Sequence, residues 1–214
     1  MKTNNTSFWV VFLLMFLGIG CQQSYTPKPK AFPRMILPAK SYQVMDNIDE
    51  IRCPFTFEIP KYSNIDNSPN VKTKSEEDYC WMDVVFQDLN ARFHISYKEI
   101  NQKVQLPNLI EDAYKLTSKH MKKAEYIDER LITTDKEVYG LFSDVGGNAA
   151  SSMQFYLTDS TQHFLYGALY FSETPNYDSI RPAIEFIKKD MLHLIETFEW
   201  KEPLLSETTM TASR

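Results

Sequence analysis

Apolar and polar residues alternate one by one along the first half of the chain's body, at the spacing of β-strands. Three stretches carry the pattern, at residues 55–59, 82–86 and 91–98. The longest of them has an apolar and a polar side, with Ala91, Phe93, Ile95 and Tyr97 on one and Arg92, His94, Ser96 and Lys98 on the other. Alternation with a period of two predicts a sheet that buries one face.

Two other stretches carry apolar residues at helical spacing. The first follows Pro107, with apolar positions at Leu109, Ile110, Ala113, Tyr114, Thr117, Met121 and Ala124. The second is the clearest element of the chain, with a stripe of Ile180, Ala183, Ile184, Ile187, Met191, Leu194, Ile195 and Phe198. Asp178 precedes this stripe and is a candidate helix cap. The spacing predicts two amphipathic helices, each able to cover a sheet.

Between the two helices the strand pattern returns, at about 126–132, 137–145, 149–158 and 163–172. Gly146, Gly147 and Asn148 predict a hairpin, because Gly and Asn accept positive φ. The stretch 163–172 is apolar on both sides, which predicts a central strand covered on both faces or open to a partner on one. The element order predicts an α+β fold, an antiparallel sheet of about six to seven strands covered by two helices. By that order alone it is similar to a PsbP-like sandwich.

The amino terminus has the parts of a secretory signal. A short basic start leads into a continuous apolar run from Phe8 to Gly20, which ends at Cys21. The run is shorter than the roughly 20 residues that a membrane span needs. The position of Cys21 resembles a bacterial lipoprotein signal, in which the chain is cut before the cysteine and the thiol is acylated. We predict residues 1–20 as a lipoprotein signal peptide and Cys21 as the lipid-attachment residue. The alternative is an uncleaved anchor with an incidental cysteine.

The residues that follow Cys21 are rich in proline. Prolines lie at positions 27, 29, 33 and 38, and they favour an extended, semi-rigid chain. We therefore predict a lipidated tether over 21–40, whose apolar end docks on the body as an edge strand through Phe32, Met35, Ile36 and Leu37. A single α+β domain is expected over 41–201. Within it we expect an exposed loop at 63–78, and after it a disordered tail over 202–214.

Composition and charge exclude several classes of protein. The chain is 43% hydrophobic and 14% aromatic, which is too apolar for a disordered chain. A formal net charge of −5 argues against a nucleic-acid partner, whose phosphates need Lys and Arg. The same charge would not draw the body to an anionic lipid surface, so the lipid at Cys21 would have to hold it at the membrane.

Two cysteines remain after Cys21. Cys53 and Cys80 each stand just before a predicted strand. An exported protein meets an oxidising compartment, so a disulfide between them is the favoured interpretation. Free structural thiols and a redox pair stay open as alternatives, although the redox pair lacks a Cys-x-x-Cys motif.

The sequence carries few motifs that are typical of a metal, cofactor or catalytic site. The four histidines lie far apart in the sequence, at His94, His120, His163 and His193. None of them has the spacing of metal ligands, so no metal site is predicted. Gly146 and Gly147 join two strands rather than lead into a helix, so no phosphate cradle and no cofactor are expected. Ser151 or Ser152 could be combined with Asp159 and His163 as a triad, but Gly-x-Ser-x-Gly is absent and a hairpin is the wrong context for a nucleophile elbow.

Several short sequence motifs occur together along the chain. They are Tyr-Thr-Pro-Lys-Pro at 25–29, Cys-Pro-Phe-Thr-Phe-Glu-Ile-Pro at 53–60, Cys-Trp at 80–81, Gly-Asn-Ala-Ala-Ser-Ser at 147–152, Thr-Asp-Ser at 158–160, Gly-Ala-Leu-Tyr-Phe at 167–171 and His-Leu-Ile-Glu-Thr-Phe-Glu-Trp at 193–200. Together they resemble the gliding-motility-associated lipoprotein GldD family of Bacteroidetes, from Cys21 to about Lys201. The resemblance carries over Cys21 as the lipid site and Cys53 with Cys80 as a pair, and it brings no catalytic residues.

The resemblance implies a non-enzymatic accessory lipoprotein of the gliding motility and type IX secretion apparatus. Such a protein would act by contact with other envelope proteins, and the hairpin of Gly146, Gly147, Asn148, Ser151 and Ser152 is our candidate interaction element. The residues after Cys21 carry no acidic run, so we expect the lipid-anchored body to face the periplasm. The first alternative function is a domain that binds lipid or peptidoglycan fragments, and the second is a hydrolase that uses Ser151 or Ser152.

Overall fold

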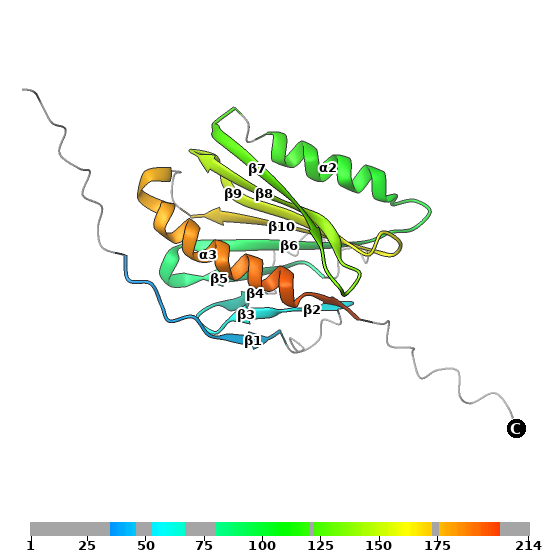
Figure 1. Cartoon of the computed structure of the whole chain (residues 1–214), viewed down its shortest axis with the longest axis horizontal. Helices are drawn as coiled ribbons and strands as arrows, with labels where there is room; N and C mark the ends of the chain where they lie inside the picture. Colours follow the sequence, from blue (N-terminus) through cyan, green and yellow to red (C-terminus); the bar gives the residue numbers. More distant parts are fainter. Residues whose placement is uncertain (1–34, 46–52, 67–79, 120–121, 173–175, 202–214) are drawn as a thin grey trace, which may run out of the picture. The chain divides into compact units, whose positions relative to one another are not determined.

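The computed structural model describes residues 35–45, 53–66, 80–119, 122–172 and 176–201. The expected signal peptide, Cys21, Phe32, His120 and the expected tail lie outside these ranges. Within them the chain forms an α+β fold with two α-helices and a seven-stranded antiparallel sheet (Figure 1). The predicted fold class is confirmed.

The main sheet has the strand order β4-β5-β6-β10-β9-β8-β7. Its strands are β4 (Asn64–Asp66), β5 (Met82–Phe86), β6 (Ala91–Glu99), β10 (His163–Phe171), β9 (Ser151–Thr158), β8 (Tyr139–Gly147) and β7 (Ala124–Thr133). All neighbouring strands pair antiparallel. The strand β10, which the sequence marks as apolar on both sides, is the central strand of the sheet.

Two small strand pairs flank the main sheet. β1 (Tyr42–Val44) pairs with β3 (Glu58–Pro60), and β11 (Glu199–Trp200) pairs with β2 (Phe55–Thr56). The stretch predicted as one strand at 55–59 is therefore two strands with different partners. This arrangement fastens both ends of the described chain to the same segment.

The helix α3 (Tyr177–Thr197) covers one face of the sheet, and Figure 1 shows it crossing in front of the strands. Its apolar stripe joins the inward side chains of the central strands in one core cluster, which includes Phe93, Phe155, Leu157, Leu165, Leu169, Ile184, Ile187, Met191 and Leu194. Phe93 and Phe155 stack in this core with their ring centroids 5.2 Å apart. The predicted burial of one face of β6 follows from this packing.

The helix α2 (Leu106–Ser118) packs on the opposite face, and only Ala113 and Thr117 in it are buried. Thr117 Oγ1 donates a hydrogen bond to Oε1 of Gln154 at 2.9 Å, which fastens the helix to β9. Because the helix is short, it covers only part of this face. Among the described residues no helix packs on the sheet around Ala168 and Tyr170 of β10, so one side of the central strand is partly open there.

Four sequence expectations are wrong in detail. Met35, Ile36 and Leu37 are exposed and form no strand, so the docking strand is β1, further along the chain. Residues 64–66 belong to the sheet as β4 rather than to an exposed loop, because their backbone pairs with β5. Ala124 opens β7 and does not extend α2. Helix α3 begins at Tyr177, so Asp178 lies inside its first turn and is not the cap.

Candidate functional site

A buried carboxylate holds the start of the described chain against α3. Asp190 is fully buried on the helix. Its Oδ1 accepts hydrogen bonds from Lys40 Nζ at 2.5 Å and from the Tyr42 hydroxyl at 2.8 Å, and its Oδ2 accepts one from the Tyr62 hydroxyl. A buried charge is tolerated when it is paired and hydrogen-bonded, and these three donors meet that requirement. We call these four residues the Asp190 clamp.

The clamp changes the titration of its two tyrosines. Burial, the hydrogen bond to Asp190 and the negative charge of that residue raise the pKa of Tyr42 to about 12. The same causes, in the same order, raise the pKa of Tyr62 far above its usual range. Both hydroxyls therefore remain protonated donors at neutral pH.

Sequence reasoning missed the Asp190 clamp, although a signal was present. Asp190 lies three residues after Ile187 and four before Leu194, so it falls on the apolar stripe of the last helix. An acidic residue at a core position needs a cation or several donors nearby. The partners could not be named from the sequence, because Lys40 and Tyr42 are 150 and 148 residues away along the chain.

Cys53 and Cys80 stand together as a disulfide in the structure, with their Cα atoms 5.5 Å apart. Cys80 is fully buried, whereas Cys53 is only partly so. The bridge spans 27 residues of sequence and ties the segment before β2 to the start of β5. The state of the two thiols in the cell remains a prediction.

The predicted interaction hairpin joins β8 to β9 through residues 148–150, so Gly146 and Gly147 belong to the strand itself. Gly147 has φ +90°, while Asn148 does not adopt positive φ. Asn148 Oδ1 instead accepts a hydrogen bond from the backbone N–H of Tyr177 at 2.9 Å, at the start of α3. In this hairpin the side chains of Ser151 and Ser152 are buried, while Asn148 and Ala150 are exposed.

The serines do not meet the other members of the hypothetical triad. Ser151 pairs with Tyr170 at one end of the β9–β10 ladder, whereas His163 precedes Phe164, the partner of Thr158, at the other end. Seven residues of strand separate the two ends, a distance of roughly 23 Å. Ser151 Oγ donates a hydrogen bond to the carbonyl of Met153. The triad is not assembled.

Asp159 and His163 have structural partners of their own. Burial alone would raise the pKa of Asp159, but hydrogen bonds from the backbone of His163, Gln162 and Thr161 and from the Thr161 hydroxyl outweigh it and lower that pKa. Burial lowers the pKa of His163 against the opposing charges of Asp159 and Glu99. The Nδ1 atom of His163 lies 2.7 Å from the Tyr97 hydroxyl, and its ring stacks on Trp200.

The described histidines do not gather into a metal site. His193 pairs with Glu58 at 2.6 Å and stacks on Tyr42, while His94 pairs with Asp83 at 2.5 Å on another face. Among the described residues, no group of three or more His, Cys, Asp or Glu could hold a metal ion.

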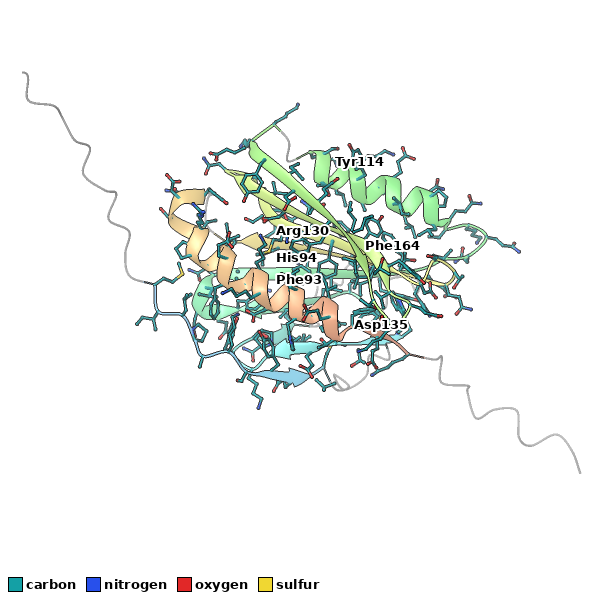
Figure 2. The ribbon with its side chains drawn as sticks, in the orientation of Figure 1. Phe93, His94, Tyr114, Arg130, Asp135 and Phe164 are labelled. Carbon is teal, nitrogen blue, oxygen red and sulfur yellow. A yellow bond between two sulfur atoms is a disulfide. The ribbon has the colours of Figure 1, made fainter. Side chains whose placement is uncertain are left out.

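A groove of about 530 Å³ lies beside α2, on the part of the sheet that the helix leaves uncovered. Its floor comes from β5, β6 and β10, and Leu116 of α2 forms a wall. Figure 2 labels Phe93 and His94, neighbours on β6 that point to opposite faces, the first into the core and the second into this groove. The alternation along β6 predicts His94 on the polar side of its strand, but no local pattern indicates that β5, β6 and β10 lie side by side.

Within the part of the chain that the structure describes, no helix has the length and apolar character of a membrane span. The family model described as gliding motility lipoprotein GldD matches residues 22–200 of the chain. It therefore covers the proline-rich segment, the Asp190 clamp, the hairpin and the groove. None of the curated proteins matches the chain.

Proposed function

Since the chain belongs to the GldD family of gliding motility lipoproteins, we propose that it is an accessory protein of the gliding motility and type IX secretion apparatus, tethered to a membrane by lipid and facing the periplasm. It acts by contact with other envelope proteins and performs no catalysis. The family supplies the connection with gliding motility and with a lipid-anchored place in the cell envelope. The secretion role, the orientation and the protein contacts are the proposal.

The observation that carries the proposal is the Asp190 clamp. A protein that works by position needs its body fixed to its tether, because a flexible junction would let the body rotate freely. Lys40 is the last residue of the expected tether, and its ammonium group is ion-paired to the fully buried Asp190. Tyr42 adds a second bond two residues later. The expected reach of the body is therefore set by the residues between Cys21 and Lys40.

Lipid attachment at Cys21 is the first part to test. Two or three acyl chains would anchor the protein stably, at about 0.8 kcal/mol for each buried CH₂ group. Cells that express the wild-type chain or Cys21→Ser are labelled with palmitate and fractionated. We expect label and membrane association in the wild type and loss of both in the variant, and label that persists in Cys21→Ser would contradict the lipid site.

Protein contact is tested by crosslinking from the hairpin. A photo-reactive residue at position 150 replaces an exposed alanine, so it leaves the buried serines in place. The control carries the same residue at position 131, an exposed position on β7. We expect position 150 to capture envelope proteins of the apparatus that position 131 does not. Equal capture from both positions, or intact gliding and secretion in a strain without this chain, would overturn the proposal.

A further inference from the structure

The floor of the groove beside α2 is a grid of side chains whose positions follow from strand register. Asp83 of β5 pairs with His94 of β6, which pairs with Ala168 of β10. In the next row on the same face, Ser96 pairs with Tyr166. Met82 pairs with Ile95, so Trp81, one residue before Met82, lies opposite Ser96. One row therefore reads Trp81, Ser96, Tyr166 across the sheet, and the row beside it reads Asp83, His94, Ala168.

This register creates a slot above Ser96. Neighbouring strands lie about 4.8 Å apart, so the Cα atoms of Trp81 and Tyr166 stand about 10 Å apart on either side of a small residue. The Tyr166 hydroxyl donates a hydrogen bond to Gln154 Oε1 at 2.6 Å, on β9 and so on the side of β10 away from β6, while Lys98 Nζ lies 5.3 Å from the centroid of the Trp81 ring. The aromatic side chains of Trp81 and Tyr166 come from either side of the small residue Ser96. Both of them line the groove, as do Ser96 and Ala168. A slot with aromatic walls and a small floor residue accepts a flat ring.

One end of the slot is polar. His94 Nδ1 lies 2.5 Å from Oδ1 of Asp83, and among the described residues no partner hydrogen-bonds the other ring nitrogen of His94. The His94 side chain is 49% exposed and lines the groove, so a ligand there can reach its imidazole ring. The Trp81 indole N–H is buried and has no hydrogen-bond partner in the described part of the chain. The exposed imidazole of His94 can hydrogen-bond a hydroxyl or amide group of a ligand, whereas the buried Trp81 N–H is not open to the groove.

The groove does not suit peptide recognition through the backbone. β5, β6 and β10 each pair with a strand on both sides, so their backbone hydrogen bonds are used within the sheet. The Asp83 carboxylate at its polar end is already paired, with Arg92 Nη1 at 3.4 Å and with His94 Nδ1 at 2.5 Å. An uncharged ligand that stacks on aromatic rings and carries several hydroxyl groups meets all of these conditions.

We propose that this groove is a carbohydrate-binding site, in which one pyranose ring of a glycan enters the slot between Trp81 and Tyr166. The C–H groups of the ring pack on the two aromatic side chains, and its hydroxyl groups bond to His94, Asp83 and Ser96. The groove volume lies within the usual range for small-ligand sites, roughly 300–1,000 Å³. This site does not depend on the accessory role, because none of the residues that line the groove lies in the hairpin loop at 148–150.

The test uses the full chain, extracted from membranes in a zwitterionic detergent without a sugar headgroup. Two uncharged glycans separate the two envelope sources of such a ring: N,N′-diacetylchitobiose stands for the N-acetylated amino sugars of peptidoglycan, and cellobiose stands for a neutral polysaccharide. Binding is measured by saturation-transfer NMR and by titration calorimetry. N-acetyl-tyrosinamide serves as a third probe, for an aromatic side chain of a protein partner.

Three variants make the result specific to the slot. Ser96→Phe fills the slot and removes neither aromatic wall, and His94→Ala removes the polar end at an exposed position. Leu131→Ser, at a side chain that is 86% exposed on β7, is the matched control. Thermal unfolding checks that all three remain folded. We expect saturable binding of at least one disaccharide, weakened about tenfold or more by Ser96→Phe, about threefold or more by His94→Ala, and unchanged by Leu131→Ser.

Three outcomes would overturn the site. The first is an absence of binding by both disaccharides up to about 10 mM. The second is binding that Ser96→Phe leaves unchanged. The third is binding of N-acetyl-tyrosinamide alone, which would assign the slot to a protein partner. The crosslinking from position 150 is independent of all three results, so failure of this site leaves the proposed accessory role standing.

Discussion

Nζ of Lys40 lies 2.5 Å from Oδ1 of Asp190, so an ion pair joins the end of the proline-rich segment to the buried face of α3. The lysine side chain is 26% exposed and the aspartate side chain is fully buried. Removing one partner of such a pair leaves an uncompensated charge in the interior, which costs more than the pair itself contributes. The Asp190 clamp therefore makes the junction between the expected tether and the domain sensitive to single substitutions.

We expect Lys40→Met to lower the free energy of unfolding by about 1–3 kcal/mol, because Asp190 keeps only its two tyrosine donors. The measurement is urea unfolding of the full chain at pH 7. Asp190→Asn removes the charge and preserves the shape of the side chain, so the double variant should show a coupling of at least about 0.5 kcal/mol. Lys122→Met, at an exposed position, is the control. Strictly additive effects of the two clamp variants would refute the ion pair.

The tyrosines of the clamp predict a loss of stability in alkali. Tyr42 has a pKa of about 12 in the folded chain and about 10 when unfolded, so the folded chain binds more protons between these values. Stability is then complete below pH 10 and decreases as pH rises from 10 to about 12. Tyr62 acts in the same direction. Unfolding measured from pH 8 to 11.5 should show this decline, and Tyr42→Phe should make it shallower. Identical slopes in both proteins would exclude the linkage.

Protonation of His163 should lower the free energy of unfolding in acid. Its pKa lies below the usual value because it is buried, so the unfolded chain takes up a proton at a pH where the folded chain does not. The stabilising contribution is complete above pH 6.5 and is lost as pH falls through the lower folded pKa. We expect the free energy of unfolding to decrease below pH 6.5 in the wild type and to respond less in His163→Asn. NMR titration of the ring of His163 gives an independent measurement, and a pKa above 6.5 would contradict the prediction.

The parts of the fold that could be predicted are those in which local pattern and tertiary environment agree. β6 alternates cleanly because α3 buries Phe93 while His94 faces away, and β10 is apolar on both sides because it is the central strand. β4 could not be predicted, since Asn64, Ile65 and Asp66 join the sheet through their backbone beside β5. The prediction of a docking strand failed at Met35–Leu37 because apolar character alone does not say whether a short segment finds a partner.

The candidate sites were harder to predict for a different reason. The groove depends on the register of three strands, and its slot exists only where Trp81 and Tyr166 flank Ser96. No local pattern contains that relation. The triad of Ser151, Asp159 and His163 is wrong for a related reason. Ser151 and His163 are close in sequence, but antiparallel pairing holds them at opposite ends of a ladder.

The disulfide makes a prediction about both mass and stability. Intact mass of the native protein should rise by two hydrogens only after reduction in denaturant, because Cys80 is fully buried. Closing a loop of 27 residues stabilises by about 3–4 kcal/mol in the chain-entropy model, so Cys53→Ala with Cys80→Ala should lose stability of that order. Alkylation of the untreated denatured chain checks the starting state. Labelling of both Cys53 and Cys80 without reductant would show free thiols.

A substitution at Gly147 tests whether backbone geometry constrains the motif Gly-Asn-Ala-Ala-Ser-Ser at 147–152. Its φ is +90°, and a Cβ added there would lie 2.7 Å from the backbone nitrogen of Glu125 and 3.0 Å from the carbonyl oxygen of Lys123. Both obstacles are backbone atoms at the start of β7, so they cannot rotate away. We expect Gly147→Ala to reduce the free energy of unfolding by about 1–3 kcal/mol, whereas Ala150→Ser at an exposed loop position changes it by less than about 0.5 kcal/mol. Urea unfolding of both variants measures the difference. Equal stability would mean that β7 and β8 can separate without cost, and that backbone geometry does not restrict position 147 to glycine.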